Sequence, residues 1–319
     1  MTPMSERGAR ERVAIVGCGL IGASWAALFL ARGHDVVATD PAPDGEARLR
    51  ATVRDAWPAL SALGLADGAS LDRLTFEADP ARAVARADFV QENGPERIEV
   101  KRETFRLLDG AARPEVVLAS SSSGLKPSAI QEACTRHPER VLIGHPFNPP
   151  HLVPLVEVVG GSRTSEAAIA GAMAFYARAG KHPIRIRREL TGHVANRLQA
   201  ALWREAFHLV ETGAASAADV DAAIAHGPGL RWALMGPCLL NHLSGGEAGI
   251  RHTLGHLGPL IQAMWDDLGA PTVSPALADT LADGIRDELA GRDLAAVVAE
   301  RDAILVELVA RKRRAAALP

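Results

Sequence analysis

Short apolar runs alternate with longer mixed segments through the first part of this chain, which has 319 residues. The short runs predict buried strands, and the segments between them, with apolar residues at helical spacing, predict helices. Pro58 is expected to interrupt one of these helices, over 46–63. Strands alternating with helices are typical of a parallel, doubly wound α/β sheet. The predicted strands cover 13–16, 35–39, 74–76, 88–92, 116–119 and 141–144.

From residue 152 the pattern changes. Strands over 155–159 and 183–187 enclose a helix over 166–179, and after Glu189 the apolar spacing is helical only. We therefore predict a sheet domain over 1–188 and an all-helical domain over 189–319. The helices predicted in the second domain cover 194–212, 218–225, 230–243, 249–264, 275–290 and 293–314.

A glycine-rich turn, Gly17-Cys18-Gly19-Leu20-Ile21-Gly22, follows the first predicted strand and precedes a helix. Gly17 permits a tight turn, Gly19 lets the backbone approach a pyrophosphate, and Gly22 lets the helix lie close to the strand. The free N–H groups and positive dipole end of that helix attract phosphate. The order of elements predicts a Rossmann-type dinucleotide-binding domain. Its cofactor-binding residues would be Gly17, Gly19, Leu20, Ile21 and Gly22.

Asp40 ends the second predicted strand, 18 residues after Gly22. A carboxylate at this place accepts hydrogen bonds from the ribose hydroxyls and repels a 2′-phosphate. No basic residue follows it directly. The sequence therefore predicts NAD as the cofactor, in preference to NADP.

Composition narrows the class of protein further. The net charge of −3 gives no electrostatic reason to expect nucleic acid or a membrane surface as a partner, and no apolar run is long enough for a transmembrane helix. The three cysteines lie far apart, so we expect no metal site and a reducing location, the cytoplasm. Residues 1–12 lack the apolar core of a signal peptide and are expected to form a frayed tail.

The candidate chemistry begins at His145, directly after the strand over 141–144, at the edge of the sheet where α/β folds bind ligands. Glu157 is the only acid in the next apolar strand, where an unpaired carboxylate is costly. A returning strand can bring it beside His145, to fix the imidazole tautomer and stabilise its protonated form. Such a pair suits removal of a hydroxyl proton while hydride leaves the same carbon. The alternative is a structural histidine with a solvent-facing Glu157.

Two further polar side chains are expected near the same edge. Ser123 ends a serine run that follows the strand over 116–119, and it could hydrogen-bond a substrate oxygen. Serine clusters also form turns with no ligand. Asn196 lies near the start of the first long helix, where it could donate to the same oxygen or serve the local backbone.

Several motifs together resemble the L-3-hydroxyacyl-CoA dehydrogenase superfamily over nearly the whole chain. They cover 13–22, 120–125, 145–157 (His-Pro-Phe-Asn-Pro, then Val-Glu-Val) and 192–198. Within it, the chain looks most like the lambda-crystallin branch, which includes L-gulonate 3-dehydrogenases and L-carnitine dehydrogenases. The stretches most similar to the carnitine enzymes are 124–128, 202–206, 229–236 and 245–252.

The resemblance implies an NAD-dependent dehydrogenase that works as a homodimer through its helical domain. It implies His145 as general base paired with Glu157, and Ser123 and Asn196 as ligands of the substrate oxygen. The chain departs from many relatives at Ser122, where they have threonine, and it lacks the aromatic residues expected in carnitine enzymes over 237–241. Positions implied to brace the site or to lie near the cofactor are Asn148, Glu96 and Lys101.

The predicted reaction oxidises the 3-hydroxyl of a small L-3-hydroxy acid, carnitine-like or gulonate-like, to the 3-keto acid. Arg231, beside Trp232, is the candidate clamp for the substrate carboxylate, because a guanidinium binds a carboxylate at two points. A surface arginine is the more ordinary alternative. Candidate aromatic partners of a trimethylammonium group are Trp203, Trp232 and Phe147. Candidate polar partners of a sugar acid are His193, Asn241 and His242.

Other functions stay open at this point. A 3-hydroxyacyl-CoA dehydrogenase should carry a basic surface for the CoA phosphates, and the charges over 46–76 are balanced. A ketoreductase acting on a β-keto intermediate of secondary metabolism would run the same chemistry backwards. An NAD-binding protein without turnover, as in a crystallin, would not need the His145 and Glu157 pair. The many apolar residues after Arg188 independently favour a dimer.

Overall fold

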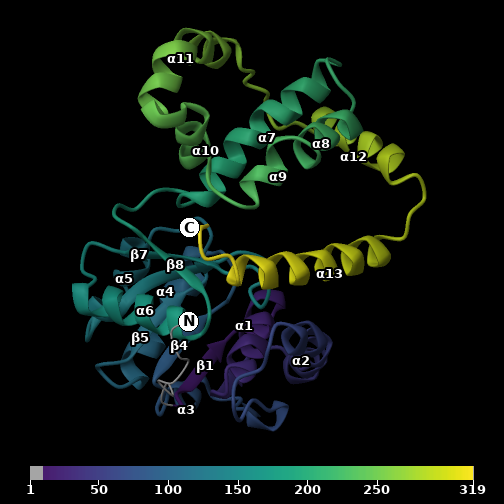
Figure 1. The fold of residues 1–319 in the computed structure, drawn as a ribbon. Helices are drawn as coiled ribbons and strands as arrows, with labels where there is room; N and C mark the ends of the chain where they lie inside the picture. The colour runs from purple at the N-terminus through teal and green to yellow at the C-terminus, as the bar shows by residue number, and fades with distance from the viewer. Residues whose placement is uncertain (1–9, 319) are drawn as a thin grey trace. The chain divides into compact units, whose positions relative to one another are not determined.

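The computed structural model describes residues 10–318, so most of the predicted frayed tail lies outside the described residues. The chain divides into two compact units, residues 1–197 and 198–319 (Figure 1). The first unit contains the sheet, and the second is helical. No helix in the described part of the chain has both the length and the apolar character needed to cross a bilayer.

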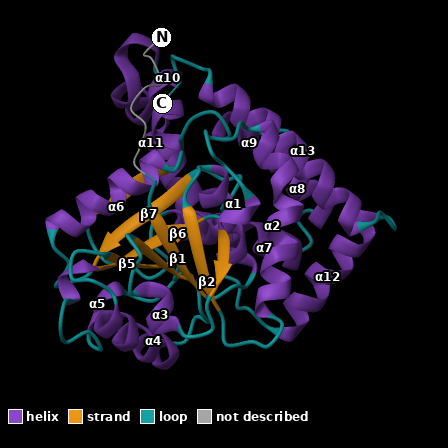
Figure 2. Ribbon diagram, turned by 90° about the horizontal axis from the view of Figure 1, so that it is seen from below, coloured by secondary structure: helices purple, strands orange, loops and turns teal. Residues whose placement is uncertain are grey.

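One sheet of eight strands forms the centre of the first unit as far as the structure describes it (Figure 2). Its order is β3-β2-β1-β4-β5-β6-β7-β8, and neighbouring strands are parallel except β6 and β7, which are antiparallel. This is the predicted doubly wound sheet, extended by a returning strand. The strands are β1 (Arg12–Val16), β2 (Asp35–Thr39), β3 (Leu74–Phe76), β4 (Phe89–Glu92), β5 (Val117–Ser120), β6 (Val141–Pro146), β7 (Leu155–Gly160) and β8 (His182–Ile186).

Helices cover both faces of this sheet because successive strand residues point to opposite sides. Val13 and Ile15 belong to the apolar core shared with α1, α2 and α6, whereas Ala14 and Val16 belong to the core shared with α3, α4 and α5. A strand buried on both faces reads as a continuous apolar run, which is why these strands were predictable. The helices are α1 (Leu20–Ala31), α2 (Gly45–Ala62), α3 (Pro80–Val84), α4 (Ile98–Ala111), α5 (Pro127–Gln131) and α6 (Glu166–Arg178).

Two local predictions in this unit were wrong. Helix α2 runs through Pro58 without interruption, since that residue is exposed while Val53, Ala56 and Leu60 bury one face of the helix. Tertiary packing here outweighs the hydrogen bond that proline removes. Strand β6 also continues past Gly144, so His145 lies within the strand instead of after it.

The second unit is built from α7 (Ala195–Glu211), which begins just before the unit boundary, and from the helices that follow. One predicted helix, over 230–243, is in fact two: the first ends at Trp232, and Gly236 and Pro237 begin the second. The remaining helices are α8 (Ala217–Ala225), α9 (Pro228–Trp232), α10 (Pro237–Ser244), α11 (Gly249–Asp267), α12 (Pro275–Leu289) and α13 (Leu294–Arg313).

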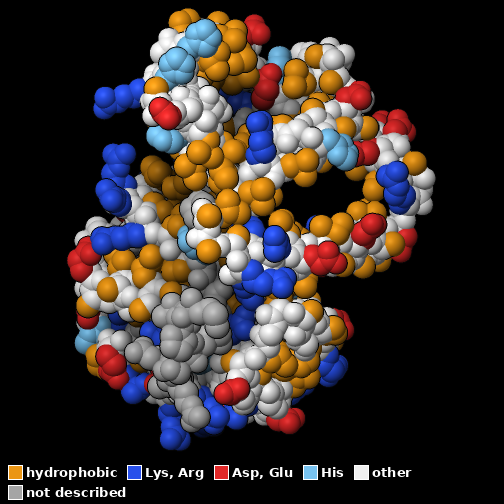
Figure 3. All heavy atoms as spheres, in the orientation of Figure 1, with side chains coloured by type: hydrophobic (Ala, Val, Ile, Leu, Met, Phe, Trp, Pro, Cys, Tyr) orange, Lys and Arg blue, Asp and Glu red, His pale blue; other side chains and the backbone are white. Residues whose placement is uncertain are grey.

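Apolar side chains remain exposed on these helices. Figure 3 shows them gathered over α11, beside histidine side chains. Within the second unit, helix α13 makes few close contacts with the other described helices, although Lys312 donates to the carbonyl of Ala233. The most exposed large apolar side chains of the unit include Leu230, Leu243, Leu260, Trp265, Val273, Leu294 and Ile304.

The three cysteines are unpaired and differ in accessibility. Cys18 and Cys134 are buried in the first unit, and Cys238 is exposed at the start of α10. Burial raises the pKa of the Cys18 thiol and of the Cys134 thiol to about 12.

Candidate active site

His145 and Glu157 face each other across the antiparallel pair of β6 and β7. The register of the two strands places them directly opposite, so their side chains lie on the same face of the sheet. Nδ1 of His145 lies 2.8 Å from Oε2 of Glu157, and both side chains are buried. The returning strand expected from the sequence thus brings the two residues into contact.

The second carboxylate oxygen of Glu157 accepts the backbone N–H groups of Val194 and Ala195, each at 2.9 Å. Burial raises the pKa of Glu157, but the hydrogen bonds from His145, Ala195 and Val194 outweigh that effect and leave the pKa below its usual value. An ionised Glu157 accepts the Nδ1–H of His145. The lone pair of the neutral imidazole then lies on Nε2, where it can take a proton.

The serine loop, residues 120–124, is fixed from one side by Glu96. Its Oε1 accepts the hydroxyl of Ser122 at 2.6 Å and the backbone N–H groups of Gly124 and Leu125 at 2.8 and 3.1 Å. Burial raises the pKa of Glu96, and these hydrogen bonds together lower it below its usual value. A carboxylate held in this way fixes the backbone that presents Ser123.

The first turn of α7 fixes the serine loop from another side. The side-chain amide of Asn196 donates to the carbonyl of Ser123 at 3.4 Å. The Ser123 side chain itself is exposed and has no hydrogen bond with another described residue. Its hydroxyl is therefore available to a ligand.

His193 lies beside His145. From the sequence we predicted it only as a candidate polar partner of a sugar acid. The two ring centroids lie 5.2 Å apart, and Nε2 of His193 donates to the carbonyl of Ser122 at 3.0 Å. Burial lowers the pKa of His193, and its Nδ1 has no hydrogen-bond partner within the described residues. Its backbone φ of 52° follows Gly192 at 76°. Its place three residues before Asn196 was the signal in the sequence that could have indicated a residue of the candidate site.

The glycine-rich turn has the shape that a dinucleotide needs. A Cβ on Gly22 would lie 1.9 Å from the carbonyl oxygen of Gly17, and Gly17 itself has φ +92°, so neither position accepts a side chain readily. A Cβ on Gly19 would meet nothing within 4 Å, and no side chain caps the start of α1. An open face at an uncapped helix N-terminus fits a pyrophosphate.

Asp40 lies directly after β2, close to that turn. Its two oxygens accept the N–H groups of Cys18 at 2.6 Å and Ala42 at 2.9 Å. These bonds hold the carboxylate in place, where it could accept a ribose hydroxyl and would face a 2′-phosphate. The residues present therefore fit NAD.

Lys101, which the resemblance implies to lie near the cofactor, forms a buried ion pair. Its ammonium is almost fully buried, 2.9 and 2.8 Å from the two oxygens of Glu92 and 2.9 Å from the carbonyl of Gly94. A buried ion pair of this kind holds the chain over residues 92–94 next to the glycine turn. Glu92 was missed because it belongs to no motif.

The other predicted site residues do not join this group in the first unit. Asn148 is exposed and makes no side-chain hydrogen bond with another described residue. Arg231 and Trp232 lie on α9 in the second unit, where both are exposed. No group of three His, Cys, Asp or Glu side chains between residues 10 and 318 is arranged to hold a metal ion.

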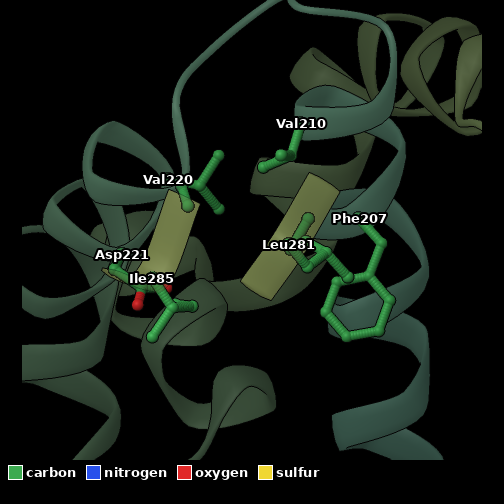
Figure 4. Close-up of a pocket in the computed structure, with 8 residues that line it drawn as sticks. Phe207, Val210, Val220, Asp221, Leu281 and Ile285 are labelled. Atoms are coloured by element: carbon green, nitrogen blue, oxygen red, sulfur yellow. The ribbon is translucent and has the colours of Figure 1, made fainter. Parts of the chain in front are cut away.

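The second unit contains an apolar pocket of ≈ 280 Å³ between α7, α8 and α12 (Figure 4). Asp221 is its acidic lining residue, and none of the predicted site residues lines it. It is therefore no candidate for the oxidation chemistry. Its apolar lining consists of Ala206, Phe207, Val210, Ala217, Val220, Leu281 and Ile285.

Two family models match the chain in succession. The model described as 3-hydroxyacyl-CoA dehydrogenase, NAD binding domain, matches residues 12–190. The model of the C-terminal domain of the same family matches residues 192–259. The first match includes the glycine turn, the serine loop, His145 and Glu157, and the second includes His193 and Asn196.

Curated relatives cover nearly the same length. L-carnitine dehydrogenase of Streptomyces coelicolor is 52% identical over 299 residues, 94% of each chain. L-carnitine dehydrogenase of Bacillus cereus is 49% identical over 94% of this chain and 91% of its own. Among solved structures, an NAD⁺-dependent 5-dehydrogenase of 5-formyl-3-hydroxy-2-methylpyridine 4-carboxylic acid superimposes with a TM-score of 0.82, at 29% identity, over 96% of this chain and 99% of its own.

Proposed function

We propose that this chain, which belongs to the 3-hydroxyacyl-CoA dehydrogenase family and is an NAD-dependent oxidoreductase, oxidises the 3-hydroxyl of L-carnitine to the 3-keto acid. The observation that carries the proposal is the 52% identity to an L-carnitine dehydrogenase over 94% of both chains. The buried His145 and Glu157 pair supplies the matching chemistry.

In the proposed reaction, His145 is the general base. Its Nε2 takes the proton of the 3-hydroxyl, and the carboxylate of Glu157 stabilises the imidazolium through Nδ1–H. Bound NAD supplies the acceptor for the hydride that leaves the same carbon. The backbone N–H groups of Val194 and Ala195 keep Glu157 ionised during this step.

Ser123 and Asn196 would bind the hydroxyl oxygen, and Glu96 would hold the loop from which Ser123 projects. We assign Arg231 to the substrate carboxylate, with Trp232 beside it. Phe147, whose ring centroid lies 5.2 Å from that of His145, offers an aromatic face suited to a trimethylammonium group. Asn148 is assigned to the rim of the same site.

The proposed cofactor site combines the glycine turn with Asp40. Gly17, Gly19, Leu20, Ile21 and Gly22 would surround the pyrophosphate. Asp40 would bind the ribose hydroxyls and disfavour NADP. Glu96 and Lys101 would act near the cofactor through the loops that they hold.

The decisive experiment compares NADH production from L-carnitine, L-gulonate, L-3-hydroxybutyrate and its CoA ester. L-carnitine should be the fastest substrate. Arg231→Met should raise KM for L-carnitine more than it lowers kcat, because it removes a two-point carboxylate contact. Activity on the CoA ester alone, unchanged by Arg231→Met, would place the substrate in the thioester class instead.

We further propose that the protein is a homodimer built mainly from its helical unit. Exposed apolar side chains on α11 and α13, among them Leu260 and Ile304, support this proposal. A 20-residue helix such as α13 needs packing partners to be stable in water, and the other described helices of its own unit provide few. The unpaired cysteines are compatible with a reducing compartment, which we take to be the cytoplasm.

A further inference from the structure

A hydrogen-bonded network of buried polar side chains lies next to the candidate site and takes no part in the chemistry proposed above. Its centre is Gln91 in β4, which is fully buried, as is Tyr176 of α6. Burying an amide costs free energy unless its hydrogen-bonding groups are satisfied. In this first unit they are satisfied, and each bond leads toward a different part of the site.

Tyr176 sets the orientation of the Gln91 amide. Its hydroxyl donates to Oε1 of Gln91 at 2.5 Å, and burial raises the pKa of Tyr176 well above its usual value, so the hydroxyl keeps its proton. The Nε2 group of Gln91 therefore faces the hydroxyl of Ser121 at 2.8 Å and the carbonyl of Gly144 at 3.2 Å. The flipped amide would place two carbonyl oxygens together.

The hydroxyl of Ser121 accepts two hydrogen bonds and donates one. Its oxygen accepts from Gln91 and from the indole N–H of Trp25 at 3.2 Å, so its own proton goes to Oδ1 of Asn93 at 2.7 Å. The side-chain amide of Asn93 then donates to the backbone carbonyl of Gln91 at 2.9 Å. The hydroxyls of Tyr176 and Ser121 each have one acceptor, and these bonds give the network a single consistent orientation.

The ends of this network meet the proposed site. The carbonyl of Gly144 belongs to the peptide group whose N–H is that of His145, so holding it limits the backbone rotation at His145. Ser121 lies two residues before Ser123. Asn93 backs onto the glycine turn, where a Cβ on Gly17 would lie 2.9 Å from its carbonyl carbon.

We propose that Gln91 is a positioning residue that sets His145 and the serine loop relative to the glycine turn, and that Tyr176 orients its amide. This inference rests on the proposed roles of His145 and Ser123. Gln91 touches no reacting atom and acts through the Gly144 carbonyl and Ser121.

The test uses Gln91→Leu with a matched control, Gln131→Leu. Gln131 is also fully buried, and its amide donates to Pro138, Val141 and Thr164, none of which adjoins a proposed site residue. Both variants should lower the Tm. Only Gln91→Leu should also reduce kcat, by about 10²-fold, the cost of displacing reacting groups by about 1 Å. NAD affinity measured by calorimetry should change little.

A double variant separates positioning from stability. Tyr176→Phe in the Gln91→Leu background removes the hydroxyl left without its acceptor, so the Tm should partly recover. The kcat should stay low, because nothing then holds the Gly144 carbonyl and Ser121. Recovery of kcat together with the Tm, or an equal loss of kcat in Gln131→Leu, would overturn the inference.

A readout without turnover keeps this inference distinct from the proposed function. The ring NMR signals of His145, assigned by their loss in His145→Ala, should shift in Gln91→Leu and stay in place in Gln131→Leu. Unshifted signals in Gln91→Leu would refute the positioning role. An unmutated protein that oxidises none of the four substrates would instead refute the proposed function.

Discussion

The two units treat their side chains in opposite ways. In the first, polar groups around His145 are buried, and most are held by hydrogen bonds within that unit. In the second, α7, α9 and α10 contain no fully buried residue, and apolar side chains such as Leu260 are exposed. Most of these polar groups therefore find their hydrogen-bond partners within the first unit, whereas the second unit has apolar surface that its own helices do not cover. Under the proposed function, a monomer holds the groups that carry out the chemistry but leaves apolar surface exposed on its helical unit.

The largest expected effect comes from removing the proposed general base in the first unit. His145→Ala should lower kcat by about 10²–10⁴-fold, the usual contribution of a general base. NAD binding and the oligomeric state should be unchanged, since His145 has no part in either. Steady-state kinetics with calorimetry of NAD binding measure both effects. A variant that keeps most of its turnover would show that the base has been misassigned.

A matched change in the helical unit should leave the chemistry alone. Ile304→Asp places a charge on an exposed apolar position of α13 and should weaken dimer association by about 30-fold, the effect of losing one strong interface residue. Light scattering across a dilution series measures the shift. Glu300→Ala, also exposed on α13, serves as the control for the helix itself. Light scattering that finds only monomers of the unmutated protein at micromolar concentration would remove the dimer proposal.

The choice between NAD and NADP tests a different part of the first unit. Asp40→Ala should improve NADP use relative to NAD by about tenfold, because it removes a carboxylate that faces the added phosphate. The ratio of kcat/KM for the two cofactors measures it. The unmutated protein should strongly prefer NAD. Equal use of both cofactors before any mutation would contradict the role of Asp40.

Acid stability gives the smallest expected effect. Burial lowers the pKa of His193 and of His34, so between pH 6.5 and the lowered values the unfolded chain binds more protons than the folded one. Stability should therefore fall as the pH drops below about 6.5, by at most about 1.4 kcal/mol per pH unit for each histidine.

His193→Asn should make that slope shallower, and His34 should retain the rest. Asparagine tolerates the positive φ at position 193, so the backbone need not change. Urea denaturation at several pH values measures the free energy of unfolding. A slope identical to that of the unmutated protein would mean that His193 is protonated as easily in the folded state as in the unfolded one.

Much of the first unit could be predicted because its signals are local. The glycine turn and the doubly buried strands follow from short sequence patterns, and the lone acid at Glu157 indicated its partner across a returning strand. Pro58 misled the prediction because burial of neighbouring side chains decides whether a helix continues. The helix over 230–243 was misjudged because its apolar spacing hid the break between Trp232 and Pro237.

The hydrogen-bond network could not be read from the sequence at all. Gln91 and Tyr176 belong to no motif, Ser121 attracts notice only as part of the serine run, and 85 positions separate Gln91 from Tyr176. Only the fold brings them together. The same holds for Lys101, whose ammonium is bound by Glu92 and not exposed beside a ligand site.

The unequal burial of the cysteines offers a fluorescent reporter without any new mutation. Maleimide dyes react with thiolate, and burial with a pKa of about 12 keeps Cys18 and Cys134 protonated at neutral pH. Cys238 is exposed on α10, so a dye should attach there alone. Mixing donor-labelled and acceptor-labelled protein would then follow the exchange of subunits in real time by energy transfer, from the unit that we expect to meet its partner.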